Sequence, residues 1–129
     1  MLVTSTPLSA DPFRLLVESV TDFGMFMLDP AGNVSSWNPG AGKILGYQSE
    51  EIVGRSVSCF HTPRDTAAGK PWRGLQIALE EGRLEEEGLW LRNGGLPFWA
   101  VVTINALHDP LGIHIGFAVV CRDSTERKF

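Results

Sequence analysis

The chain has 129 residues, of which 43% are hydrophobic and 20% are charged, and its formal net charge is −4. This length suits one domain, and the composition is that of a folded protein rather than a disordered one. The negative charge argues against a nucleic-acid-binding protein, because phosphate binding needs a basic surface. The two cysteines, Cys59 and Cys121, are flanked by apolar residues, which predicts buried free thiols and a cytoplasmic location. No apolar run approaches the roughly 18 residues that span a membrane, so we expect no membrane contact by this segment.

Residues 1–10 lack periodicity and are expected to form a flexible tail. A flanking helix is predicted over residues 11–20, because Asp11 suits its cap and Pro12 its first position. One face of this helix is apolar and carries Phe13, Leu16, Val17 and Val20. Such a face must dock on another surface, and the outer face of the sheet predicted below is the natural candidate.

The middle of the chain predicts two strands followed by short helices. Their expected ranges are strands over 24–28 and 34–37, a helix over 38–46 capped by Asn38, a helical turn over 49–54, an irregular piece over 56–62 and a helix over 71–81.

The last third of the chain predicts three antiparallel strands that end at residue 123. Two turn signals, Asn93-Gly94-Gly95 and Asp109-Pro110-Leu111-Gly112, separate three apolar runs. Side chains at 102, 104 and 106 are apolar and those at 103 and 105 are polar, which is the alternation of a strand. A sheet in so short a chain needs a cover, and the helices before it can supply one. The predicted fold class is therefore α+β.

Five pieces of the sequence together resemble the PAS sensor domains. They are Phe-Met-Leu-Asp-Pro-Ala-Gly (26–32), Ser-Trp-Asn-Pro-Gly-Ala with Leu-Gly-Tyr (36–41 and 45–47), Ser-Glu-Glu-Ile-Val-Gly-Arg (49–55), Gly-Leu-Pro-Phe-Trp-Ala (95–100) and Arg-Asp-Ser-Thr-Glu-Arg-Lys (122–128). Each piece alone is a weak signal, but five in this order, over residues 13–128, are a strong one.

The resemblance implies a five-stranded antiparallel sheet, elements in the order ββααααβββ, and a ligand pocket between the sheet and the short helices on one of its faces. It implies one sensor domain over 11–123, with its core over 24–123, and a linker over 124–129 that leads to an output domain absent from this chain. That output domain is expected to be a histidine kinase or, as an alternative, a cyclic-di-nucleotide enzyme. The domain itself is not expected to be an enzyme, because no nucleophile motif or phosphate-binding loop is present.

Cofactors of related sensors are disfavoured by particular residues. Light sensors of the LOV type that bind flavin carry a reactive cysteine where this chain has Val57, and polar amides where it has Trp90, Ala100 and Cys121. Haem sensors place a histidine on the long helix, and residues 67–82 contain none. Cys59 and His61 are the only close Cys–His pair, too few for a metal site. We therefore expect a colourless protein that holds no metal and either no ligand or an unknown small molecule.

Matching the chain to the family assigns two sets of site residues, and apolar surface that one monomer would leave exposed predicts a third. The ligand pocket would be lined by Phe26, Leu28, Val57, Phe60, Leu75, Leu79, Trp90, Ala100, Val102, Phe117, Val119 and Cys121. The signal would leave through Asp123, Thr125 and Arg127. A homodimer would form through Phe13, Leu16, Val17 and Val20 together with Trp99 and Val101 on the outer face of the sheet, where the flanking helix can also cover Trp99. Two functions remain open: sensing a ligand or partner to control a kinase, and ligand-free assembly.

Overall fold

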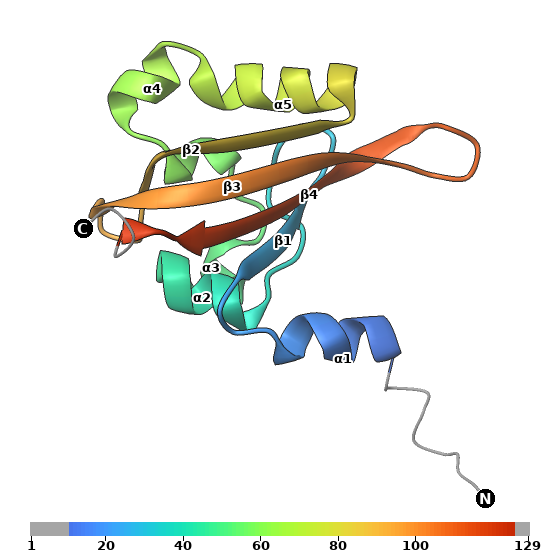
Figure 1. Cartoon of the computed structure of the whole chain (residues 1–129), viewed down its shortest axis with the longest axis horizontal. Helices are drawn as coiled ribbons and strands as arrows, with labels where there is room; N and C mark the ends of the chain where they lie inside the picture. The colour runs from blue at the N-terminus through green and yellow to red at the C-terminus, as the bar shows by residue number, and fades with distance from the viewer. Residues whose placement is uncertain (1–10, 126–129) are drawn as a thin grey trace, which may run out of the picture.

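The computed structural model describes residues 11–125, which form one antiparallel sheet and a set of short helices (Figure 1). The strands are ordered β1-β4-β3-β2 across the sheet. In chain order the elements are α1 (Pro12–Ser19), β1 (Gly24–Leu28), α2 (Pro39–Leu45), α3 (Ser49–Ile52), the 3₁₀ helix η2 (Val57–Phe60), α4 (Pro63–Ala67), α5 (Lys70–Glu81), β2 (Arg83–Leu91), β3 (Pro97–His108) and β4 (His114–Asp123). The predicted α+β class and the final three-strand meander are confirmed, but the sheet has four strands rather than five.

The predicted second strand, residues 34–37, runs beside β1 without becoming part of the sheet. The backbone amide of Ser35 donates to the Met27 carbonyl at 2.8 Å, as in a strand pair. The amide of Met27, however, donates to the side-chain oxygen of Ser36 at 3.0 Å. Because a hydroxyl takes the place of a backbone carbonyl, the ladder is interrupted, and this is why the prediction of a fifth strand was wrong.

The long helix α5 buries one of its two predicted pocket residues, Leu75, but not the other, Leu79. Its buried residues are Pro71, Leu75 and Ala78, whereas Leu79 is 38% exposed. Leu79 therefore lies outside the buried face of the helix, and its prediction as a pocket residue was wrong. The buried face includes Ala78, a small side chain that lets the helix approach the sheet closely.

The flanking helix α1 has no buried side chain. Asp11 caps it as predicted, because its Oδ1 accepts a hydrogen bond from the Phe13 amide at 2.9 Å. The helix lies at the β1 margin of the sheet (Figure 1), whereas Trp99 and Val101 lie on β3, two strands away. The prediction that α1 covers Trp99 within its own chain was therefore wrong, and the apolar face of α1 is open.

Candidate functional site

The inner face of the sheet and the helices above it form a continuous hydrophobic core. Eleven of the twelve predicted pocket residues belong to it, Leu79 being the exception: Phe26, Leu28, Val57, Phe60, Leu75, Trp90, Ala100, Val102, Phe117, Val119 and Cys121. Register explains this grouping, because Val102 lies opposite Cys121 in the β3–β4 pair and both side chains point to the helices. The sequence thus identified the correct face of each strand.

Aromatic rings cluster in the region where a PAS ligand was expected. Phe60 on η2 is fully buried and lies parallel to Trp90 on β2, with ring centroids 5.3 Å apart. Its neighbours include Trp37, stacked at 6.0 Å, Phe26 at 5.5 Å and Tyr47 at 6.1 Å. Offset aromatic contacts of this kind stabilise a core beyond simple area burial. The Phe60–Trp90 stack therefore joins η2 to β2, the edge strand of the sheet.

One polar group at the edge of this stack has no hydrogen-bond partner among residues 11–125. His61 is buried, its ring centroid lies 5.2 Å from that of Trp90, and its Nδ1 atom is unpaired. Burial, followed by the positive charge of Lys70, lowers the pKa of His61 to about 4, so the imidazole is neutral at pH 7. Most buried polar atoms in folded proteins are paired, so this nitrogen is an exception.

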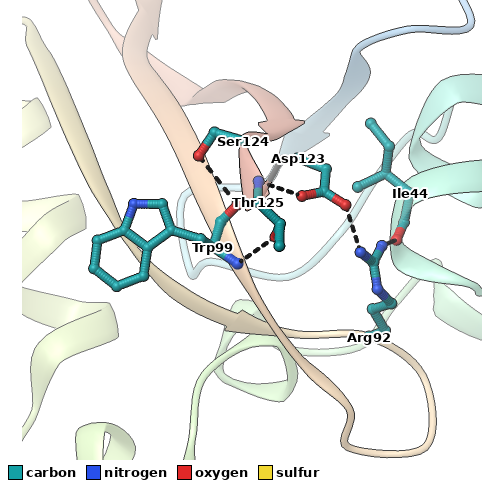
Figure 2. A network of polar contacts seen from close by, with 6 residues as sticks. All are labelled: Ile44, Arg92, Trp99, Asp123, Ser124 and Thr125. Atoms are coloured by element: carbon teal, nitrogen blue, oxygen red, sulfur yellow. Dashed lines mark hydrogen bonds and ion pairs between the residues drawn. The ribbon is translucent and has the colours of Figure 1, made fainter. Parts of the chain in front are cut away.

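The end of β4 is held by a polar network (Figure 2). One carboxylate oxygen of Asp123 accepts a hydrogen bond from the Thr125 amide at 2.8 Å, and the other accepts one from the Arg92 guanidinium at 2.5 Å. The hydroxyl of Thr125 accepts a hydrogen bond from the Trp99 amide at 3.2 Å, and the Ser124 amide donates to the Trp99 carbonyl at 2.9 Å. The chain therefore leaves the sheet in a fixed direction.

Arg92 connects this exit to the helices. Its guanidinium also donates to the backbone carbonyl of Ile44 on α2 and lies over the ring of Phe98, 4.1 Å from the centroid. Partial burial raises the pKa of the Asp123 carboxyl, but hydrogen bonds from Thr125 and Arg92 outweigh it and hold that pKa below its usual value. Sequence reasoning found Asp123 and Thr125 but missed Arg92, and the predicted Arg127 lies outside the described residues.

A groove runs between α1 and the outer face of β1 and β4. Its volume is about 670 Å³, and its walls include Phe13, Val17, Met27 and Val120. Trp37 also lines this groove and borders a second hollow of about 450 Å³ along α2. Of the four dimer residues predicted on the flanking helix, Phe13 and Val17 therefore line an apolar groove, whereas Leu16 and Val20 do not.

Both cysteines are free, as predicted, and burial raises the pKa of Cys59 and takes that of Cys121 to about 12. These thiols are therefore protonated at neutral pH and are poor nucleophiles. Within residues 11–125 there is no group of three or more His, Cys, Asp or Glu side chains placed to hold a metal ion. Among the helices of the same range, none has the length and apolar character needed to cross a bilayer.

Comparison with known proteins places these features in a family. A family model described as PAS domain matches residues 22–126. Two-component system protein A of Emericella nidulans is 46% identical over 118 residues, which cover 92% of this chain and 17% of that protein. The cell-division control histidine kinase PdhS of Brucella ovis is 27% identical over 124 residues, which cover 92% of this chain and 11% of the kinase. The chain thus spans less than a fifth of the length of either relative.

Solved structures share the architecture. A PAS domain from Colwellia psychrerythraea matches with a TM-score of 0.81 at 22% identity, covering 89% of this chain and 96% of that chain. A domain of a sensory box sensor histidine kinase/response regulator from Geobacter sulfurreducens matches with a TM-score of 0.74 at 20% identity, covering 92% and 97% respectively. At these identities the likeness establishes the fold.

Proposed function

Because this chain belongs to the PAS domain family, with a role in signal transduction, we propose that it is the regulatory module of a multidomain histidine kinase and passes its signal through residues 123–125. The domain is not itself catalytic, so the kinase activity resides in an output domain that continues from the C-terminal end of this chain. The cytoplasmic location inferred from the two cysteines stays a prediction.

The observation that carries this proposal is the network around Asp123. A carboxylate that holds Thr125 on one side and Arg92 on the other pins the chain where it leaves the sheet. The exit can exist with these hydrogen bonds formed or broken. A change between two such arrangements is what an output domain can detect. A signal that binds one arrangement more tightly shifts the equilibrium between the two arrangements. The shift cannot exceed the difference in its binding free energy for them.

The test is the autophosphorylation of the full-length protein with and without its natural signal. We expect the Arg92→Gln variant to fold but to give a fixed output, either high or low, because the exit has lost its anchor. A full-length Arg92→Gln protein whose output follows the signal as the wild type does would contradict the proposal.

On the input side, we propose that contacts along α1 and the outer face of the sheet, including those of a homodimer, provide the signal. Two observations support this. The Phe60–Trp90 stack packs η2 against β2 on the inner side of the sheet, and the apolar groove with Phe13 and Met27 in its walls lies beside α1. An exposed apolar surface of this kind commonly marks an interaction site. Sedimentation of the purified chain across a range of concentrations tests the dimer.

One observation favours a second candidate, the sensing of a small molecule. The unpaired Nδ1 of His61 lies beside Trp90, and a ligand with a polar group would satisfy it. Native mass spectrometry of the purified chain tests this directly, and a ligand-sized mass increment that disappears in His61→Phe would support it. An absorption spectrum of the same sample should show neither a Soret band nor flavin bands, since the residues that hold those cofactors in related sensors are missing.

A further inference from the structure

Helix α2 is held at its two ends by segments that are far apart in the chain. Asn38 precedes its first residue, and the turn between β2 and β3, residues 92–95, lies against its last. In Figure 1, α2 lies between α1 on one side and the end of β4 on the other. The contacts at the first end connect α2 to α1. Those at the second end connect it, through Arg92, to the exit at Asp123.

At the first end, one side chain joins α2 to the end of α1 and to the segment before β1. Asn38 is 2% exposed, and its Oδ1 caps α2 by accepting a hydrogen bond from the Ala41 amide at 2.8 Å. Its Nδ2 group lies 3.2–3.3 Å from the carbonyl oxygens of Val17, Val20 and Phe23. The same amide therefore binds the start of α2 and the end of α1.

The backbones also meet directly at this end. A Cβ atom built at Gly40 would lie 1.9 Å from the carbonyl oxygen of Phe23, so only glycine permits the contact. The first turn of α2 thus rests on the segment that leads from α1 to β1. A displacement of that segment must move α2, because no flexible side chain separates the two.

At the second end, the β2–β3 turn caps the helix. The backbone amide of Asn93 donates to the Leu45 carbonyl at 2.8 Å, and its side chain donates to the Gly46 carbonyl at 3.0 Å. Arg92 donates to the Ile44 carbonyl, which a helix end otherwise leaves unpaired. The same guanidinium binds Asp123 at the exit.

We propose that α2 couples α1 to the exit, so that a change in the position of α1 shifts the Asp123 network. The path of this coupling runs along α2 and does not involve the inner face of the sheet. A helix of seven residues is about 10 Å long and is stiff over that length. The coupling is a free energy shared by the two ends, and it therefore acts equally in both directions. This inference rests on the proposed function in one respect: the exit must carry the output for the coupling to regulate it.

The first test releases α1 and observes the exit, using the 129-residue chain. Asn38→Asp keeps the Oδ1 acceptor that caps α2 but replaces the amide donor that binds the three carbonyls. The readout is hydrogen exchange of the Ser124 and Thr125 amides, followed by NMR. We expect exchange there to accelerate by about fivefold or more, the lower range of typical couplings between sites.

The second test works from the other end and uses a variant of a side chain that is only half-buried. Arg92→Gln should accelerate exchange at the amides of α1, among them Leu15 and Val20, although Arg92 contacts neither. The matched control is Thr62→Ala, which removes the cap of α4, where Thr62 Oγ1 accepts from the Asp65 amide at 3.1 Å. The control should change neither the α1 amides nor the exit amides.

Effects confined to the mutated end in both variants would overturn the coupling. If Asn38→Asp does not fold, Arg92→Gln decides alone, and α1 amides that exchange as in the wild type would overturn it. Such a result would leave the proposed function standing, because the phosphorylation assay tests that function in the full-length protein and independently of α1.

Discussion

Arg92 and Asp123 are 31 positions apart in the chain, yet a guanidinium nitrogen of one and a carboxylate oxygen of the other are separated by 2.5 Å. The pair ties the β2–β3 turn to the last residue of the sheet. Both side chains are partly exposed, 28% and 34%, and exposed ion pairs contribute little to stability. Its main consequence is therefore the direction in which the chain leaves the sheet.

Replacing Asp123 should separate output from folding. We expect the free energy of unfolding of Asp123→Ala to lie within about 1 kcal/mol of the wild-type value, because the ion pair is partly solvated. The full-length kinase that carries this substitution should lose or alter its response to the signal. Urea unfolding and autophosphorylation measure the two effects. Glu85→Ala, which breaks the exposed Arg83–Glu85 pair on β2, is the control and should alter neither. A normal response in Asp123→Ala would remove the network from the mechanism.

Phe26→Ala should destabilise the domain by about 3–5 kcal/mol, as large-to-small core substitutions do. The Phe26 side chain is 2% exposed, and its ring centroid lies 5.1 Å from that of Trp37. Phe23→Ala is the matched control, because Phe23 is 40% exposed and its loss should matter far less. Equal unfolding free energies for the two variants would show that the aromatic cluster does not stabilise the fold.

Two glycine substitutions should act in opposite directions. Gly40→Ala places a methyl group against the Phe23 carbonyl and should destabilise by about 3 kcal/mol or more, since backbone cannot move aside as a side chain can. In Gly74→Ala the new methyl group meets only the end of the Leu84 side chain, at 3.3 Å. Alanine favours a helix over glycine, so this variant should gain up to about 1 kcal/mol. Chemical denaturation of both variants measures the contrast.

Stability should fall on mild acidification because of His61. Its pKa is about 4 when folded and about 6.5 when unfolded, so between these values the unfolded chain binds the extra proton. The stability is complete above pH 6.5 and declines toward pH 4. Between pH 7 and pH 5 we expect a loss of about 2 kcal/mol that is absent in His61→Gln. Urea unfolding at both pH values measures this loss. If the free energy of unfolding changed by the same amount with pH in the wild type and in His61→Gln, His61 would not be its cause.

The proposed dimer predicts that one charged residue on α1 is enough to prevent association. Phe13 is 77% exposed and lines the outer groove, so Phe13→Asp should give a monomer where the wild type sediments as a dimer. Leu111→Asp is the control: Leu111 is 84% exposed but lies at the β3–β4 turn, away from that groove. A wild-type chain that stays monomeric at high concentration would exclude this interface.

Local signals predicted the parts of this fold that depend on neighbouring residues. The caps at Asp11 and Asn38 and the meander strands were found because each depends on a short stretch of sequence. The fifth strand was predicted wrongly because the hydroxyl of Ser36 takes a hydrogen bond that the pattern assigned to the backbone. Arg92 was missed because its partners are Ile44 and Asp123, both distant in sequence, and no local pattern marks such a pairing.

The interrupted ladder beside β1 has a consequence for how copies of this protein meet in a crowded cell. The outward-facing amides of Met25 and Met27 bind the side-chain oxygens of Asn38 and Ser36, and their carbonyls accept hydrogen bonds from the Asn38 and Ser35 amides. This margin of the sheet therefore offers no free backbone groups to a strand from another chain. The opposite margin, β2, carries consecutive glutamates at 85–87, whose like charges repel a second copy. The first margin is protected by hydrogen bonding and the second by charge, and both protections act against edge-to-edge aggregation.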